Sequence, residues 1–380
     1  MKRDEFQREY IKDFDAPKKE RKHIILIDGT WNDETGKGLS GLVTNIVNLQ
    51  KILINDPDQI VRYHRGVGND DDNKFMGTLW KGATGRGTRK IVDKAYARFV
   101  EDWQNGDEVY IFGFSRGAAA ARLLAKKIYD QSVPKKITIT YGPKVNRETK
   151  VIEQRIKKYD IEGPVLEPTV DIEFVGVWDT VSAFRLFNNI ERFLRIKERD
   201  LFTDNFIAPN IKRAVQLVAI DETRNIFNPS LMNNVDGITH EVWFPGVHAD
   251  LGGSYADNEL AKSSLHYMLE MLKEHIDKTG AKPLLIDPDS YDALTIKNIS
   301  KAHFHFHGLS WGKSLRKIFV QENGKPSETL QPKIHQSYQM LCTSNQTYST
   351  VKKKKKNFHV RFQYMPINVK LLNRKFKIEK

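Results

Sequence analysis

The sequence predicts an α/β fold with a mainly parallel central sheet flanked by helices. Short apolar segments of β-strand composition alternate along the chain with longer segments whose apolar residues fall at helical spacing. The chain has 380 residues, of which 39% are hydrophobic and 29% are charged, close to the averages of globular proteins. A chain of this length and composition can bury a substantial core.

Each predicted strand is a short apolar segment bounded by turn residues or by a helical segment. The clearest is residues 23–27, a continuous aliphatic run that ends at Asp28 and Gly29. Segments rich in β-branched and aromatic residues predict further strands at 61–64, 108–112, 171–178 and 241–244. Segments whose apolar residues recur at helical spacing, or that are rich in helix-favouring residues, predict helices at 45–54, 89–103, 116–129, 211–220 and 259–275.

Shifts in composition divide the chain into three parts. Residues 1–21 form a basic N-terminal segment, and residues 22–285 form the main domain, with an insertion at about 131–170. Residues 286–380 form a basic C-terminal region, irregular beyond Pro283, that packs on or extends the main domain. No apolar run approaches the about 20 residues of a membrane-spanning helix, and the charged N-terminus lacks the apolar segment of a secretory signal. We therefore expect a protein made in the cytoplasm, with at most peripheral membrane contact.

The charge balance favours an anionic partner. Lys and Arg number 61 against 48 Asp and Glu, which leaves a net charge of +13. Basic residues concentrate near the two ends, and the densest run is Lys352, Lys353, Lys354, Lys355 and Lys356. This run predicts contact with an anionic phospholipid surface, whereas no recognised nucleic-acid-binding module is present and no nucleic acid is expected. The single cysteine, Cys342, excludes an intramolecular disulfide.

Ser115 is the candidate nucleophile. It lies at the centre of a G-x-S-x-G sequence between Gly113 and Gly117, with a predicted strand before it and a predicted helix after it. A nucleophile elbow needs both elements and small flanking residues, because the chain turns so sharply that larger side chains would collide. This context predicts an α/β-hydrolase fold with Ser115 at the elbow.

Asp179 and His248 are the candidate partners of Ser115, since the acid and the histidine follow the serine in this fold. Asp179 comes directly after a predicted strand, and His248 lies on the loop after a later strand. The imidazole takes the hydroxyl proton while the carboxylate fixes its tautomer. Asp221 and Asp250 are alternative acids, although we expect Asp250 to brace the His248 loop.

The oxyanion of the tetrahedral intermediate needs two backbone N–H groups. The residue after the nucleophile, Arg116, supplies one, and the turn after the first strand supplies the other from Gly29 or Thr30. We expect Asp28 to shape that turn rather than to bind a metal.

A second G-x-S-x-G sequence surrounds Ser310, but no Asp follows it, so we interpret it as a chance match. Glu322 and His335 are the partners that it could still use. His303, His305 and His307 alternate with phenylalanines, which on a strand would align three possible zinc ligands. No nearby Cys or carboxylate completes such a site, so no metal is predicted. The glycine-rich stretch 65–88 lacks a phosphate-binding motif and favours a lid or substrate loop.

The chain resembles the Tle1-like phospholipases, the family also described as DUF2235. The resemblance extends over about residues 22–372 and rests on several motifs that occur in order. They lie at residues 27–32, 113–118, 176–181, 219–224, 243–255, 334–337 and 364–368.

The resemblance implies an α/β-hydrolase core with a Ser115, Asp179 and His248 triad. It further implies hydrolysis of glycerophospholipid esters, an antibacterial role, and delivery into a target cell by a type VI secretion system. An immunity protein and a secretion-spike protein are the partners that this role implies. Ester hydrolysis through an acyl-enzyme on Ser115 requires no cofactor. Two alternatives remain open: an esterase or thioesterase acting on soluble acyl groups, and a catalytically silent protein that binds membranes or partners through its basic surfaces.

Overall fold

The computed structural model describes the greater part of the chain. The described residues are 4–29, 43–66, 85–145, 151–181, 207–256, 258–294, 296, 299, 302–303, 314–344, 347–353, 356–362, 364–373 and 375–380. Among them, no helix is both long enough and apolar enough to cross a membrane.

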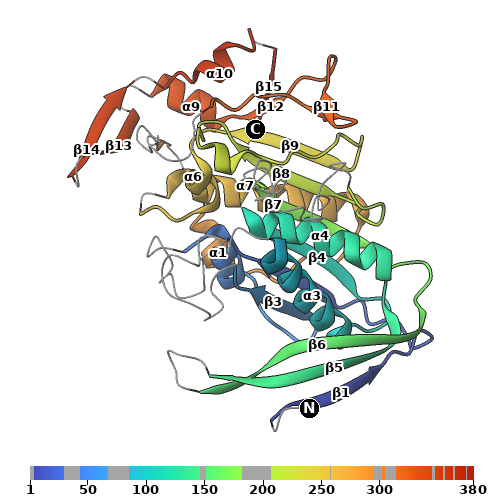
Figure 1. Ribbon diagram of the computed structural model, residues 1–380. Coiled ribbons are helices and arrows are strands. Elements are labelled where there is room, and N and C mark those ends of the chain that lie inside the picture. The colour runs from blue at the N-terminus through green and yellow to red at the C-terminus, as the bar shows by residue number, and fades with distance from the viewer. Residues whose placement is uncertain are drawn as a thin grey trace, which may run out of the picture.

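An eight-stranded parallel sheet forms the centre of the protein (Figure 1), which confirms the predicted fold class. Its strand order is β15-β12-β9-β8-β7-β4-β2-β3, and each strand runs parallel to its neighbours. The carboxyl ends of the strands therefore share one edge, where ligands bind in sheets of this kind. The strands are β2 (Lys22–Ile27), β3 (Gln59–His64), β4 (Glu108–Phe114), β7 (Ile172–Trp178), β8 (Ala214–Ala219), β9 (Thr239–Phe244), β12 (Lys333–His335) and β15 (Lys377–Glu379).

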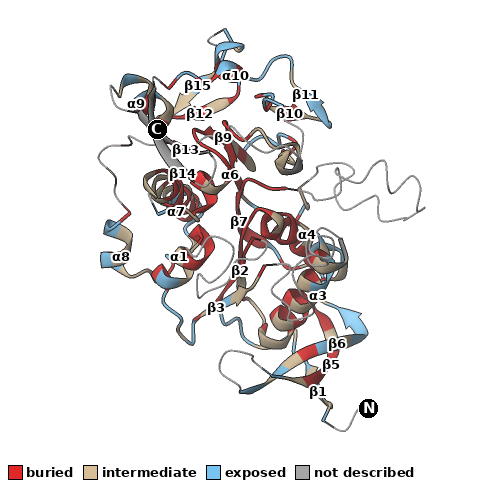
Figure 2. Ribbon diagram, turned by 60° about the vertical axis from the view of Figure 1, so that its left-hand side comes forward, coloured by how far each residue is buried: buried red, intermediate tan, exposed pale blue. Residues whose placement is uncertain are grey.

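Helices cover both faces of this sheet. Ile25 and Ile27 of β2 belong to one buried cluster, while Ile24 and Leu26 belong to another on the opposite face. Figure 2 shows the central strands buried between these layers. Burial on both faces explains why the strands are continuously apolar rather than alternating. The first cluster includes α3 (Gly85–Asp102) and α4 (Arg116–Gln131), and the second includes α1 (Asn45–Ile52) and α7 (Glu259–Thr279).

The helix predicted at 211–220 is wrong. Residues 214–219 form β8, which pairs with β7 on one side and β9 on the other. All six residues of β8 are buried, so its apolar side chains serve both faces of the sheet. A short, continuously apolar segment has no periodicity that separates a strand from a buried helix, and Val215 and Val218 were the signals that favoured a strand.

The segment after α4, where the sequence predicted an insertion at about 131–170, forms a long antiparallel hairpin. It pairs with β1 in a separate sheet of order β1-β5-β6, at the lower edge in Figure 1. Ile137 and Ile139 place this sheet in the same buried cluster as α3 and α4. The basic N-terminal segment thus contributes a strand that packs on the main domain. The three strands are β1 (Phe6–Ile11), β5 (Pro134–Val145) and β6 (Ile152–Val165).

The region beyond Pro283 is more regular than its composition predicted. Strands β12 and β15 extend the central sheet beyond β9, so this region shares a sheet with the elements that precede it. A hairpin of β13 (Thr347–Lys353) and β14 (Lys356–Phe362) lies at one end of the molecule in Figure 1. The other elements of the region beyond Pro283 are α8 (Pro288–Asp292), β10 (Gln321–Glu322), β11 (Lys325–Pro326), α9 (Ser337–Thr343) and α10 (Ile367–Lys370).

Candidate active site

Ser115 lies in the single-residue turn between β4 and α4. Its backbone has φ 59° and ψ −121°, a conformation that costs a non-glycine residue energy and is typical of functional turns. A Cβ atom on Gly113 would lie 2.4 Å from the carbonyl oxygen of Gly117, and one on Gly117 would lie 2.2 Å from that of Ile27. Both positions therefore require glycine. The structure has the strained strand-turn-helix geometry of a nucleophile elbow.

Asp179 and His248 lie together beside this elbow. Asp179 follows β7, and the Ser115 backbone N–H donates to the carbonyl oxygen of Trp178, the preceding residue, at 2.9 Å. His248 begins the short helix α6 (His248–Gly252) after β9. Its Nδ1 lies 2.6 Å from Oδ2 of Asp179, and both side chains are buried. This contact orients the ring so that Nε2 can serve as the proton acceptor.

Two aromatic rings hold the imidazole of His248 between them. Phe114 stacks on it with a centroid distance of 4.6 Å, and Phe227 lies against it at 4.7 Å. Phe114 is the residue before Ser115, and Phe227 ends the 3-10 helix η2 (Asn225–Phe227). The packing restricts the ring to an orientation beside the elbow, as preorganised catalytic groups require.

Asp179 is a buried carboxylate in contact with Arg316 and His248. Burial alone would raise its pKa, but the Arg316 guanidinium and His248 hold the pKa well below its usual range. Arg316 donates from Nη1 to Oδ1 at 2.6 Å and from Nη2 to Oδ2 at 2.9 Å. The backbone N–H of Ala219 donates to Oδ1 at 3.0 Å. Asp179 is therefore ionised over the whole physiological pH range.

Asp28 is fully buried and organises the turn after β2. Its carboxylate accepts hydrogen bonds from the Thr44 hydroxyl at 2.9 Å and the Tyr63 hydroxyl at 2.7 Å. The Gly29 amide donates to Oδ1 of Asp28 at 2.6 Å, so in this structure it points at that carboxylate rather than at an oxyanion. Thr30 lies outside the described residues. Arg116 opens α4, where the positive end of the helix dipole favours a developing negative charge.

The alternative acids have other contacts. Asp250 accepts from the Val247 backbone N–H at 2.8 Å and lies 2.6 Å from Nδ1 of His303. Asp221 accepts from the Gly246 N–H and the Tyr364 hydroxyl, each at 2.6 Å. Both carboxylates thus brace the chain just before His248, whereas Asp179 contacts the imidazole itself.

Asp221 makes the stability of the protein depend on pH. Burial, with repulsion from Asp250, raises its pKa from 3.8 to about 7. The folded state therefore binds this proton more tightly than the unfolded state, and the resulting stability is lost as pH rises through 7. We expect Asp221→Asn to gain about 2 kcal/mol in free energy of unfolding relative to the native protein between pH 5 and pH 8. Urea unfolding at both pH values measures this difference, and a difference that does not change with pH contradicts the account.

Several sequence predictions fall on residues outside the described part of the chain. These are Ser310, His305, His307 and residues 67–84 of the glycine-rich stretch. His303 is described and stacks on the Tyr255 ring at 3.8 Å. Within the described residues, no group of three or more His, Cys, Asp or Glu side chains is arranged to hold a metal ion.

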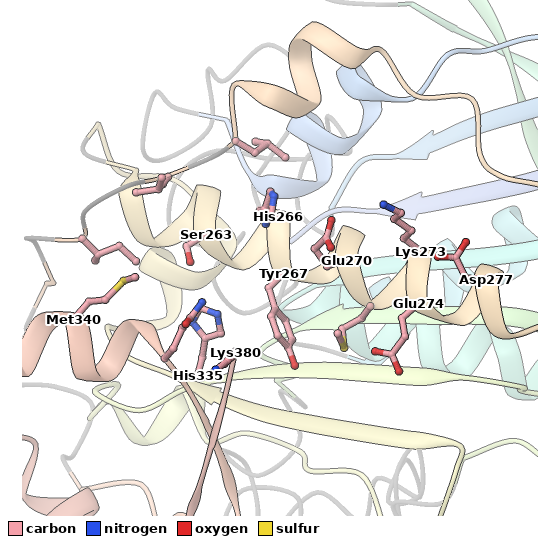
Figure 3. Close-up of a pocket in the computed structure, with 15 residues that line it drawn as sticks. Ser263, His266, Tyr267, Glu270, Lys273, Glu274, Asp277, His335, Met340 and Lys380 are labelled. Carbon is pink, nitrogen blue, oxygen red and sulfur yellow. The ribbon is translucent and has the colours of Figure 1, made fainter.

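A cavity of about 590 Å³ lies along α7, away from the elbow (Figure 3). Side chains of α7 such as His266 and Glu270 face it, together with His335 and Lys380 from the C-terminal region. Ser115, Asp179 and His248 are not among its lining residues. The ring of His335 stacks on Phe244 at 4.1 Å, and its Nδ1 lies 2.8 Å from the Ser337 hydroxyl, which is a packed structural environment.

Sequence reasoning missed Arg316 and the two phenylalanines that hold His248. Arg316 lies in a basic region where charge is usually solvated, and no motif marks it. Phe114 is adjacent to Ser115, and its size at an otherwise small-residue turn was the available signal. Glu222, next to Asp221, forms an ion pair with Arg224 at 2.7 Å. It also accepts from the His248 backbone N–H at 3.3 Å.

Comparison with solved structures finds distant likenesses. They include an uncharacterised protein from Pseudomonas aeruginosa (17% identity, TM-score 0.41), with 73% of this chain and 49% of that chain covered. The Tle1 effector solved bound to the VgrG spike is 19% identical, with TM-score 0.38 and coverage of 62% and 52%. Esterase Est2 of Thermogutta terrifontis is 14% identical, with TM-score 0.35 and coverage of 73% and 91%. This chain thus spans about half the length of the first two.

No curated protein sequence matches the chain significantly. The family model described as type VI secretion phospholipase effector Tle1-like, catalytic domain, matches residues 21–271. The matched region begins just before β2 and ends within α7, so it includes the elbow, Asp179 and His248. The chain belongs to the Tle1-like family of type VI secretion phospholipase effectors.

Proposed function

We propose that this protein hydrolyses ester bonds of membrane glycerophospholipids through an acyl-enzyme on Ser115. The observation that carries the proposal is the 2.6 Å contact between His248 and Asp179 beside a strained serine elbow. Membership of a phospholipase effector family supports a lipid ester as the substrate.

The proposed reaction has two halves. Nε2 of His248 takes the hydroxyl proton of Ser115 as Oγ attacks the ester carbonyl carbon, and Asp179 stabilises the imidazolium that forms. The Arg116 amide faces the oxyanion. The intermediate collapses as the bond to the leaving alcohol breaks and His248 protonates that oxygen. Water then attacks the acyl-enzyme by the same route and releases the fatty acid.

Fatty-acid release from mixed phospholipid vesicles tests this function. The native protein should release fatty acid with or without a chelator, because the triad uses no metal. The Ser115→Ala variant should release none. Release that survives in the variant, or that the chelator abolishes, contradicts the proposal. Hydrolysis of soluble short-chain esters with no release from vesicles would instead support the esterase alternative.

We propose that the hairpin of β13 and β14 contacts the membrane surface. Its register pairs Lys353 with Lys356, so lysines of the run end β13 and begin β14; Lys354 and Lys355 lie outside the described residues. Each lysine near an anionic leaflet contributes about 1 kcal/mol of attraction.

Replacing Lys352 to Lys356 by Gln should weaken binding to anionic vesicles at least about 10-fold, as measured by cosedimentation. The matched control removes the same charge from exposed lysines elsewhere. Its five Lys→Gln changes are at Lys18, Lys19, Lys51, Lys90 and Lys157. Equal binding by the two variants would refute a specific role for the hairpin.

We also propose that the protein is delivered into a target cell by a type VI secretion system, with a spike protein and an immunity protein as partners. Family membership supports this role. Copurification of the full chain with the spike protein of its own system tests the first contact, and failure of the two proteins to associate counts against it.

A further inference from the structure

Arg316 brings a positive charge into the centre of the site. It lies in residues 314–320, which form no helix or strand, outside the region that the family model matches, and is 4% exposed. Its guanidinium forms two parallel hydrogen bonds with the Asp179 carboxylate, at 2.6 and 2.9 Å. This fork geometry fixes the plane of a carboxylate, which a single donor does not.

The surrounding chain holds the guanidinium in place. Nη1 also donates to the carbonyl oxygen of Ala219 at 2.7 Å, and Nη2 donates to that of Phe227. The Asn368 amide donates to the carbonyl oxygens of Ile220 at 2.9 Å and of Arg316 itself at 3.4 Å. Arg316 thus links the Asp179 carboxylate to the end of β8 at Ala219 and to η2, which carries Phe227.

Arg316 and His248 share one oxygen of Asp179. Oδ2 accepts from Nη2 of Arg316 and lies 2.6 Å from Nδ1 of His248. The guanidinium charge offsets part of the carboxylate charge, so the imidazole faces a weaker negative charge. Other charged groups near the pair are Glu222, which accepts from the His248 backbone N–H, with its partner Arg224, and the buried Asp221, which Arg316 attracts.

We propose that Arg316 is a positioning residue for the triad: it fixes the Asp179 carboxylate in the plane that orients His248, and its charge offsets part of the carboxylate charge that the imidazole faces. This inference rests on the proposed function. It also means that the C-terminal region completes the support of a site whose other parts lie within residues 21–271.

The pH profile of Ser115 labelling by a fluorophosphonate separates the two effects, because labelling needs a neutral imidazole and no particular substrate. In Arg316→Met, the acid limb of the rate profile should move up by about one pH unit, and the plateau should fall about 10-fold. In Arg316→Lys, the limb should stay near its native position while the plateau still falls, since an ammonium keeps the charge but lacks the fork.

Arg122→Met is the control for burial of an arginine. Arg122 is also buried, and it donates to the carbonyl oxygens of Ser230 and Leu231. This variant should lose stability yet keep the native profile. Circular dichroism checks that each variant is folded at the pH values used.

A native acid limb and plateau in folded Arg316→Met would overturn the role of Arg316. So would equal displacement of the acid limb in the Lys and Met variants, because the charge would then have no effect. Absence of labelling in the native protein is a different result: it would overturn the proposed function itself.

Discussion

Ser115→Ala should reduce ester turnover by about 10⁴-fold or more while leaving the fold intact. The loss belongs to the chemical step, because Ser115 is the proposed nucleophile that forms the acyl-enzyme. Stability should change little, since the Ser115 side chain makes no capping hydrogen bond to α4. Alanine also carries the same Cβ as serine into the positive-φ turn. Turnover and thermal unfolding of the purified variant measure both effects.

Ser132→Ala is the matched control. Ser132 lies at the other end of α4, is also buried, and also has a positive φ of 49°. Its hydroxyl donates to the carbonyl oxygen of Leu166 at 2.9 Å, so its removal should cost about 1 kcal/mol of stability. Turnover should be retained. Substantial activity in Ser115→Ala would move the nucleophile elsewhere, with Ser310 as the first candidate.

Asp179→Asn should remove activity and stability together. The amide no longer stabilises the imidazolium or selects the right tautomer, so kcat should fall by about 10⁴-fold. Unlike the Ser115 change, it leaves the buried Arg316 guanidinium without its carboxylate. An uncompensated buried charge should cost about 3 kcal/mol in free energy of unfolding. Turnover and urea unfolding measure the two losses.

A second substitution separates these losses. Asp179→Asn combined with Arg316→Met removes both charges of the pair, so it should recover much of the lost stability. Activity should stay absent, because His248 still lacks its carboxylate. An Asp179→Asn variant as stable and as active as the native protein would contradict the assigned geometry.

The elbow could be predicted from the sequence because its requirements are local. Gly113, Ser115 and Gly117 lie within five residues, and the strand and helix that flank them have clear compositions. The alternation of strands and helices likewise predicted the parallel sheet. Both signals come from neighbouring residues, where spacing alone determines which side chains meet.

Features that depend on distant parts of the chain could not be predicted. Arg316 meets Asp179 across 137 residues, and nothing near either position encodes that contact. The helix expected at 211–220 failed because its apolar run is buried on both faces of the sheet, which removes the alternation of a half-exposed strand. Strands β12 and β15 were missed because each has only three residues.

Mapping of a fluorophosphonate adduct tests the central claim most directly. The folded protein is treated with the reagent, digested, and analysed by mass spectrometry. The account predicts one adduct, on the peptide that contains Ser115, and its loss when the protein is unfolded before treatment or carries His248→Ala. An adduct on Ser310, or no adduct in the folded protein, would contradict it.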